Sequence, residues 1–163
     1  MAVHMVAERP GLTRGVLFVH STQRALCPHL EWAINDVLGS RVSLDWLPQP
    51  VLPGQVRGEV SWQAKPGTAA RITSALRQFK TVRYEVAEEP GKGAEGERFA
   101  VTPELGVFRA TMGPHGDIMI HEDRLRAILN AAGDDPAELR TGLNLILGAA
   151  WDAELEPFRR AGD

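Results

Sequence analysis

Residues 15–39 read GVLFVHSTQRALCPHLEWAINDVLG, and this stretch predicts a strand that leads into a helix. Residues 15–20 form a nearly continuous run of β-branched and aromatic side chains, which is typical of a central strand buried on both faces. Pro28 suits the first turn of the helix, and Gly39 suits its end. The apolar side chains between them recur at helical spacing: Leu30, Ile34, Val37 and Leu38.

The alternation of strand and helix continues beyond this stretch. Polar and apolar residues alternate in 41–47 and again in 56–63, which predicts two further strands. Residues 67–79 carry a helical apolar stripe with Thr68 as N-cap, and residues 81–87 predict another strand. The resulting order β-α-β-β-α-β is that of the split-βαβ, ferredoxin-like arrangement.

The remainder of the chain predicts an extension of this core. An exposed loop at 88–97 is followed by short strands at 98–102, 106–112 and 116–120, the last two joined as a β-hairpin by the turn GPHG. Helices are expected at 121–133 and 134–158. We therefore predict a flexible N-terminal arm at 1–14 and a single α+β domain at 15–160. Its fold is a ferredoxin-like βαββαβ core extended by a β-hairpin and two C-terminal helices.

Composition narrows the class of protein. The chain has 163 residues, 44% of them hydrophobic and 24% charged, which fits one globular domain. A net charge of -3 argues against nucleic-acid binding, because counterion release needs clustered Lys and Arg. A single cysteine fits a reducing cytoplasm. The opening residues lack a signal-peptide pattern, and no apolar run approaches the length of a membrane span. We therefore expect a cytoplasmic protein.

Strand alternation predicts one apolar and one polar face of the sheet. Trp46, Trp62 and Tyr84 are expected beneath the two crossover helices. The opposite face is polar, and the later hairpin or the C-terminal helix is expected to cover part of it and leave a groove. The side chains predicted on this face are Ser43, Asp45, Arg57, Glu59, Ser61, Arg83 and Glu85.

A nucleophile is one candidate chemistry. Cys27 precedes Pro28 at the expected helix start, where free amides and the helix dipole lower the pKa of a thiol. With His20 and His29 nearby, it forms a candidate Cys–His catalytic set. The alternative is that Cys27 is a small buried hydrophobe. A metal site using these residues and Glu31 is not predicted, because a Cys-x-His spacing on a helix does not converge on one ion.

A second candidate site is an anion-binding rim. We expect strands 15–20 and 56–63 to be parallel neighbours, which would bring the N-termini of both crossover helices to one edge. Helix N-termini attract phosphate and carboxylate groups. The candidate ligand-binding residues at this edge are Ser21, Thr22, Lys65, Gly67 and Thr68.

The stretches VLFVHS, LCPHLEWAINDVLG, VSLDWLPQP, RGEVSWQ and GVFRATMGPHGDIMIHEDRLRAIL together resemble an actinobacterial family of unknown function, DUF3145. The resemblance covers nearly the whole chain after the N-terminal arm. It implies no activity, but members of that family are often encoded beside genes of type II fatty-acid synthesis. The resemblance therefore implies a link to lipid metabolism.

The leading hypothesis is a non-enzymatic binding or regulatory protein that needs no cofactor or metal. Its partner is expected to be an anionic small molecule or a protein of fatty-acid metabolism. The alternatives are an enzyme that uses Cys27 and His20, and a structural homodimer that pairs through sheet faces or edges. No nucleotide loop, serine elbow or zinc-hydrolase motif is present in the sequence.

Overall fold

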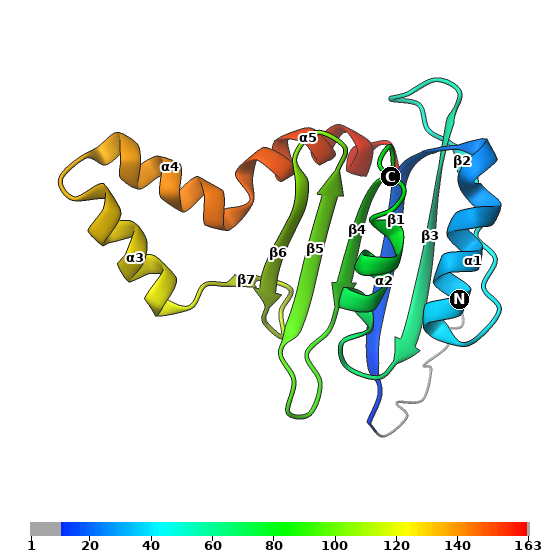
Figure 1. Cartoon of the computed structure of the whole chain (residues 1–163), viewed down its shortest axis with the longest axis horizontal. Helices are drawn as coiled ribbons and strands as arrows, with labels where there is room; N and C mark the ends of the chain where they lie inside the picture. Colours follow the sequence, from blue (N-terminus) through cyan, green and yellow to red (C-terminus); the bar gives the residue numbers. More distant parts are fainter. Residues whose placement is uncertain (1–10, 163) are drawn as a thin grey trace.

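The computed structural model describes residues 11–162, which form a mixed α+β structure around one antiparallel sheet (Figure 1). In these residues the seven strands are β1 (Thr13–Gln23), β2 (Leu47–Pro48), β3 (Gln55–Ala64), β4 (Arg83–Glu88), β5 (Gly96–Thr102), β6 (Gly106–Met112) and β7 (Ile118–Met119). The five α-helices of the same range are α1 (Cys27–Leu38), α2 (Thr68–Leu76), α3 (Glu122–Ala132), α4 (Pro136–Leu147) and α5 (Ala149–Arg160). Residues 1–10 of the predicted arm lie outside the described residues, and residues 13–14 of it belong to β1 instead.

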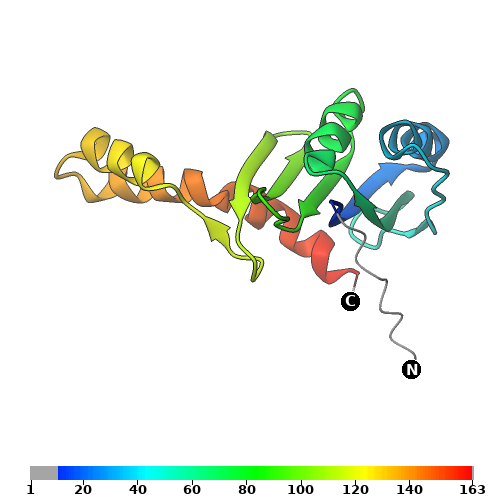
Figure 2. The ribbon, with the colours of Figure 1, turned by 90° about the horizontal axis from the view of Figure 1, so that it is seen from below.

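The sheet lies between two layers of helix. Helices α1 and α2 cover one face, and α5 crosses the opposite face (Figure 2). The main core lies between the sheet and α1 and α2, and it contains Trp62 and Tyr84 as predicted. Trp46 packs against its margin. A smaller core beneath α5 contains Ala100, Phe108, Ala110 and Leu155.

Strand β1 is the centre of the fold. The strand order is β2-β3-β1-β4-β5-β6-β7, and β1 runs antiparallel to both β3 and β4. The prediction that strands 15–20 and 56–63 run parallel is wrong, because Thr13 pairs with Ala64 and Gln23 pairs with Gln55. Helix α1 carries the chain back along β1 to the start of β2. The turn between β2 and β3 then reverses the direction of the chain, so β3 runs antiparallel to β1.

Residues 41–46, part of a predicted strand, form an irregular segment instead. This segment is hydrogen-bonded to side chains of α1. The backbone amide of Val42 donates to the side chain of Asn35. The amide of Leu44 donates to Glu31 at 3.1 Å, and the indole of Trp46 donates to the same carboxylate oxygen at 2.9 Å. These donors are satisfied by helix side chains, so the sheet ladder is limited to β2 at this edge.

The predicted second C-terminal helix is two helices that meet at Gly148. The backbone of Gly148 has φ +70°, and a Cβ there would lie 2.6 Å from the ring of Phe108. Only glycine tolerates both the positive φ and the close approach of the Phe108 ring. The positive φ ends α4 and bends the chain sharply at this residue. Helices α3 and α4 project beyond the sheet as a hairpin, and α5 turns back across it (Figure 1).

Candidate functional site

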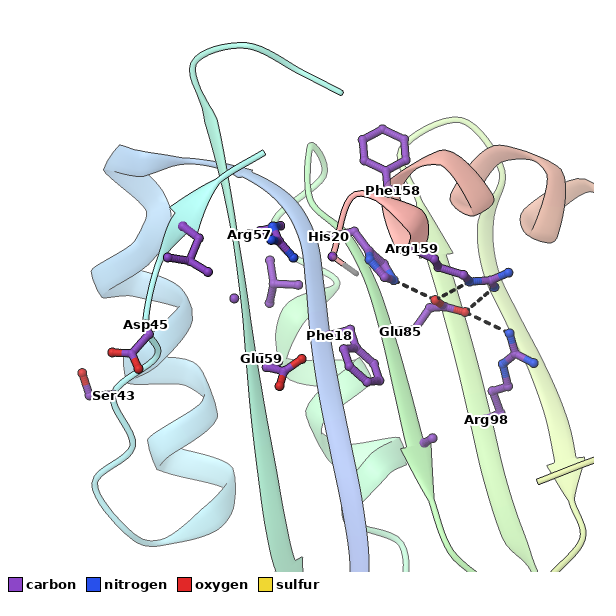
Figure 3. Close-up of a pocket in the computed structure, with 15 residues that line it drawn as sticks. Phe18, His20, Ser43, Asp45, Arg57, Glu59, Glu85, Arg98, Phe158 and Arg159 are labelled. Atoms are coloured by element: carbon purple, nitrogen blue, oxygen red, sulfur yellow. Dashed lines mark hydrogen bonds and ion pairs between the residues drawn. The ribbon is translucent and has the colours of Figure 1, made fainter. Parts of the chain in front are cut away.

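The predicted groove on the polar face is present, and the end of α5 bounds it. Its volume is about 760 Å³. Strands β1, β3 and β4 form its floor, and β2, β5, the irregular segment and the end of α5 also contribute lining residues (Figure 3). The side chains that matter for its chemistry are Phe18, His20, Arg57, Glu59, Glu85 and Arg159.

Glu85 is the buried centre of a charge cluster on one side of this groove. Its carboxylate accepts hydrogen bonds from Arg159 Nε at 2.9 Å and from Arg98 Nη2 at 3.0 Å. His20 Nε2 lies 2.7 Å from Oε2 of Glu85, the oxygen that also accepts from Arg159 Nε, and Figure 3 shows the three partners converging on the carboxylate. Asp152 also accepts from Arg159 at 2.9 Å. Strands β1, β4 and β5 and helix α5 are thereby joined at one point.

The cluster makes Glu85 a fixed negative charge. Burial on its own raises the pKa of Glu85, but the hydrogen bonds from Arg159 and His20 outweigh burial and hold that pKa well below its ordinary value. The hydrogen bond to Glu85 in turn raises the pKa of Arg159. A carboxylate whose lone pairs are already occupied by cationic donors is a poor general base. Its role is therefore to anchor α5 to the sheet.

The backbone around His20 is held by a buried amide. The pairing of β1 shifts register between Val19 and Ser21 on the β4 side, so a bulge lies at His20. The side-chain amide of Gln49 donates to the His20 carbonyl at 2.7 Å, and Gln49 is fully buried. His20 also stacks on Phe18, with the ring centroids 6.1 Å apart. These contacts orient both rings toward the groove.

Arg57 lines the groove without a counter-charge in the described residues. Within residues 11–162 its guanidinium forms no ion pair, and its buried Nε has no hydrogen-bond partner. The backbone of Gly162 passes close by, since a Cβ there would lie 2.8 Å from Nη1 of Arg57. A guanidinium group has five donors, and burying one unsatisfied costs free energy. Arg57 is therefore the groove residue best placed to receive an anion.

The predicted anion-binding rim does not exist, because its two halves lie at opposite ends of β1. Ser21 and Thr22 are near the end where β1 meets the start of β3. Lys65, Gly67 and Thr68 follow the other end of β3, next to Thr13. Ser21 and Thr22 are also fully buried within the extended strand, so their hydroxyls do not face solvent.

The amides at the start of α2 are already occupied by a carboxylate of the chain. Glu88, which is buried, accepts from the amide of Gly67 at 3.1 Å and from that of Thr68 at 3.2 Å. It also accepts from the hydroxyl of Thr13 at 3.0 Å. The Thr68 hydroxyl donates to the carbonyl of Lys65 instead of capping the helix. Sequence reasoning predicted an anion at this helix terminus, and the anion is Glu88.

Replacing Glu88 with alanine is expected to lower the free energy of unfolding by about 1–2 kcal/mol, the typical loss for a helix cap. Hydrogen exchange at the amides of Gly67 and Thr68 should accelerate as well. Urea denaturation and amide exchange measure the two effects. The neighbouring exposed Glu89→Ala is the control, and equal stability of the two variants would contradict the assignment.

Cys27 is not placed to be a thiolate nucleophile. Burial raises the pKa of the Cys27 thiol and outweighs the opposing effect of Arg24. The thiol lies near the carbonyl of Gln23, at 3.9 Å. His20 points into the groove on the other face of the sheet, and His29 is exposed. The structure therefore does not bring the three candidate catalytic residues together, and the pKa shift of Cys27 has the opposite direction to the one predicted.

Three important groove residues were not named as candidates in the sequence analysis: Phe18, Arg98 and Arg159. Phe18 was hidden within a continuous apolar run, although its spacing of two from His20 placed both on one face. Arg159 contacts Glu85 across 74 positions of the chain, a separation over which periodicity gives no signal.

In the described part of the chain, no helix is long and apolar enough to cross a membrane. Residues 11–162 also contain no group of three or more metal-ligating side chains.

Comparison with known proteins gives one match. The model of the family described as "Protein of unknown function (DUF3145)" matches residues 16–163. No curated protein and no solved structure matches the chain. The match spans every strand and helix described above except the first residues of β1.

Proposed function

The chain belongs to the DUF3145 family, and from that premise we propose that it is a cytoplasmic, non-enzymatic binding protein for a small anionic molecule. The groove beside α5 is the proposed site, and Arg57 is the proposed anchor for the anion. The family assigns no activity, so the proposal depends on the geometry of this chain.

The observation that carries the proposal is the unsatisfied guanidinium of Arg57. In residues 11–162 it has neither an ion pair nor a partner for its buried Nε. The other groove arginines, Arg98 and Arg159, are already engaged with Glu85 and Asp152. A carboxylate or phosphate oxygen next to Arg57 would satisfy the free donors in a geometry that guanidinium groups favour.

The surroundings of Arg57 support a small ligand with an apolar part. Phe18 and Leu47 both line the groove, with 37% and 51% of their surfaces exposed. Concave sites that combine apolar walls with a few polar anchors are typical of small-molecule binding. The low pKa of Glu85 and the raised pKa of Cys27 both weigh against acid–base or thiol catalysis. The resemblance to a family linked to fatty-acid synthesis makes acyl carboxylates and CoA esters the first ligands to examine.

The test is calorimetric titration of the full chain with acetate, hexanoate, phosphate, CoA and butyryl-CoA. We expect at least one of them to bind, and Arg57→Gln to weaken it by roughly 10- to 100-fold, since a hydrogen bond to a charged group contributes about 1.5–3 kcal/mol. The exposed Arg41→Gln is the matched control and should leave the affinity unchanged. Absence of binding across the set, or equal effects of the two substitutions, would overturn the proposal.

We also propose that β1 to β4 with α1 and α2 constitute a ferredoxin-like core. Support comes from the order β2-β3-β1-β4 with antiparallel neighbours and from two helices on one face. Each helix connects strands that are separated by one intervening strand, as in a split βαβ unit. Strands β5 to β7 and the three C-terminal helices then extend this core.

A further inference from the structure

Phe18 lies between two carboxylates in the groove. In the register of the sheet it is directly opposite Glu59 of β3 and directly opposite Glu85 of β4. All three residues line the groove, and Figure 3 shows them on its floor. The ring of Phe18 is therefore flanked by one acidic side chain on each side.

The two carboxylates differ in their partners. Glu85 is buried and binds His20, Arg98 and Arg159. Glu59 is exposed to the groove and, among residues 11–162, has no hydrogen bond or ion pair. The negative charge of Glu85 is neutralised within the protein, whereas that of Glu59 is available to a ligand.

Glu59 and Arg57 are two positions apart on β3, so their side chains share one face of the sheet. The strand rise of about 3.3 Å per residue separates their Cα atoms by about 7 Å. The two charges do not form an ion pair with each other. Strand β3 thus presents one unpaired cation and one unpaired anion to the groove, beside the ring of Phe18, and Asp45 of the irregular segment is a second groove carboxylate without a partner in residues 11–162.

From this arrangement we infer that the ligand carries both an anionic group and an ammonium group, joined by an apolar linker. The inference rests on the proposed function and specifies the class of ligand. The anionic group binds Arg57, and the ammonium binds Glu59. The ammonium also meets the face of Phe18, where a cation–π contact adds to the attraction. The linker packs along the apolar part of the groove.

The test uses pairs of ligands that differ only in the amine. Hexanoate is compared with ε-aminohexanoate, and butanoate with γ-aminobutanoate, by calorimetric titration of the full chain. We expect ε-aminohexanoate to bind about tenfold more tightly than hexanoate, and γ-aminobutanoate to bind more tightly than butanoate. Glu59→Gln should remove the gain, so that ε-aminohexanoate no longer binds more tightly than hexanoate. Arg57→Gln should weaken both members of each pair.

The outcomes separate this inference from the proposed function. If hexanoate binds in an Arg57-dependent manner and the amine adds no affinity, the inference fails and the anion site stands. If the amine adds affinity that persists in Glu59→Gln, the assignment of Glu59 is wrong. If neither hexanoate nor ε-aminohexanoate binds, the inference fails, and the proposed function fails as well only if acetate, phosphate, CoA and butyryl-CoA also do not bind. Glu104→Gln, an exposed substitution outside the groove, is the control for a general change in charge.

Discussion

Replacing Glu85 with glutamine should lower the free energy of unfolding by about 3 kcal/mol at neutral pH. The substitution keeps the shape of the side chain but leaves Arg98, Arg159 and His20 around a neutral amide. Removing one member of a buried charge cluster is costly because the remaining charges lose their counter-charge. The expected loss in the free energy of unfolding is at the lower end of the range for broken buried ion pairs. The reason is that the side chains of Arg98 and Arg159 are about one quarter exposed and retain some water.

The pH dependence of this effect has a definite sign. Because the pKa of Glu85 is lowered by folding, its contribution is fully present above the ordinary value of 4.5 and is lost as the pH falls below it. The stability difference between wild type and Glu85→Gln should therefore shrink on acidification below about pH 4.5. Urea denaturation between neutral and acidic pH measures it. The exposed Glu122→Gln, which removes an ion pair within one helix, should change stability by less than about 0.5 kcal/mol. A pH-independent difference for Glu85→Gln would contradict the account.

Replacing Gly15 with alanine should destabilise the protein by about 3 kcal/mol, the upper end of the usual cost of overpacking a core. Glycine in a strand interior is ordinarily unfavourable, so alanine would be expected to help. Here Gly15 is directly opposite Trp62, and a Cβ at position 15 would lie 2.0 Å from the indole ring. Trp62 is buried in the main core and has little room to move.

A double-mutant cycle isolates this contact. Trp62→Leu alone is destabilising because it removes a large buried side chain. Once the indole is gone, Gly15→Ala should become neutral or slightly stabilising, which gives a coupling energy of about 3 kcal/mol. Denaturant unfolding of the four proteins measures it. An equal cost of Gly15→Ala with and without Trp62 would show that the ring is not the cause.

Local pattern predicted most of the elements near β1. The apolar run at 15–20, the alternation at 56–63 and the helical stripes at 28–39 and 67–79 all correspond to elements of the structure, the last of them to the shorter helix α2. The two faces of the sheet were also correct, because residues two apart in a strand share a face. The polar face that carries Arg57, Glu59 and Glu85 is the floor of the groove.

Elements whose form depends on distant partners were not predictable in the same way. Residues 41–46 alternate like a strand, but Glu31 and Asn35 of α1 take up their backbone donors. The direction of β3 depends on the turn between β2 and β3, and strand alternation is the same in either direction. Gly148 ends α4 because its backbone has a positive φ and lies against Phe108, a contact that only the folded chain reveals.

In the candidate site too, local sequence pattern predicted some features, whereas others depend on residues distant in the chain. Arg57 and Glu59 were placed on the correct face by their spacing alone. Their lack of partners followed only from the structure, because α5 supplies Arg159 to Glu85 and supplies no carboxylate to Arg57. A charge becomes a candidate for ligand binding when the fold leaves it unpaired in a concave site.

The most direct test of the central claim is the side-chain NMR signal of Arg57 Nε–H during titration with hexanoate. The signal is identified by its absence from the spectrum of Arg57→Gln. We predict that it shifts progressively as the anion binds and that its hydrogen exchange with water slows. A signal that remains unchanged while calorimetry reports binding would mean that the anion is held elsewhere, and would contradict the assignment of this groove as the site.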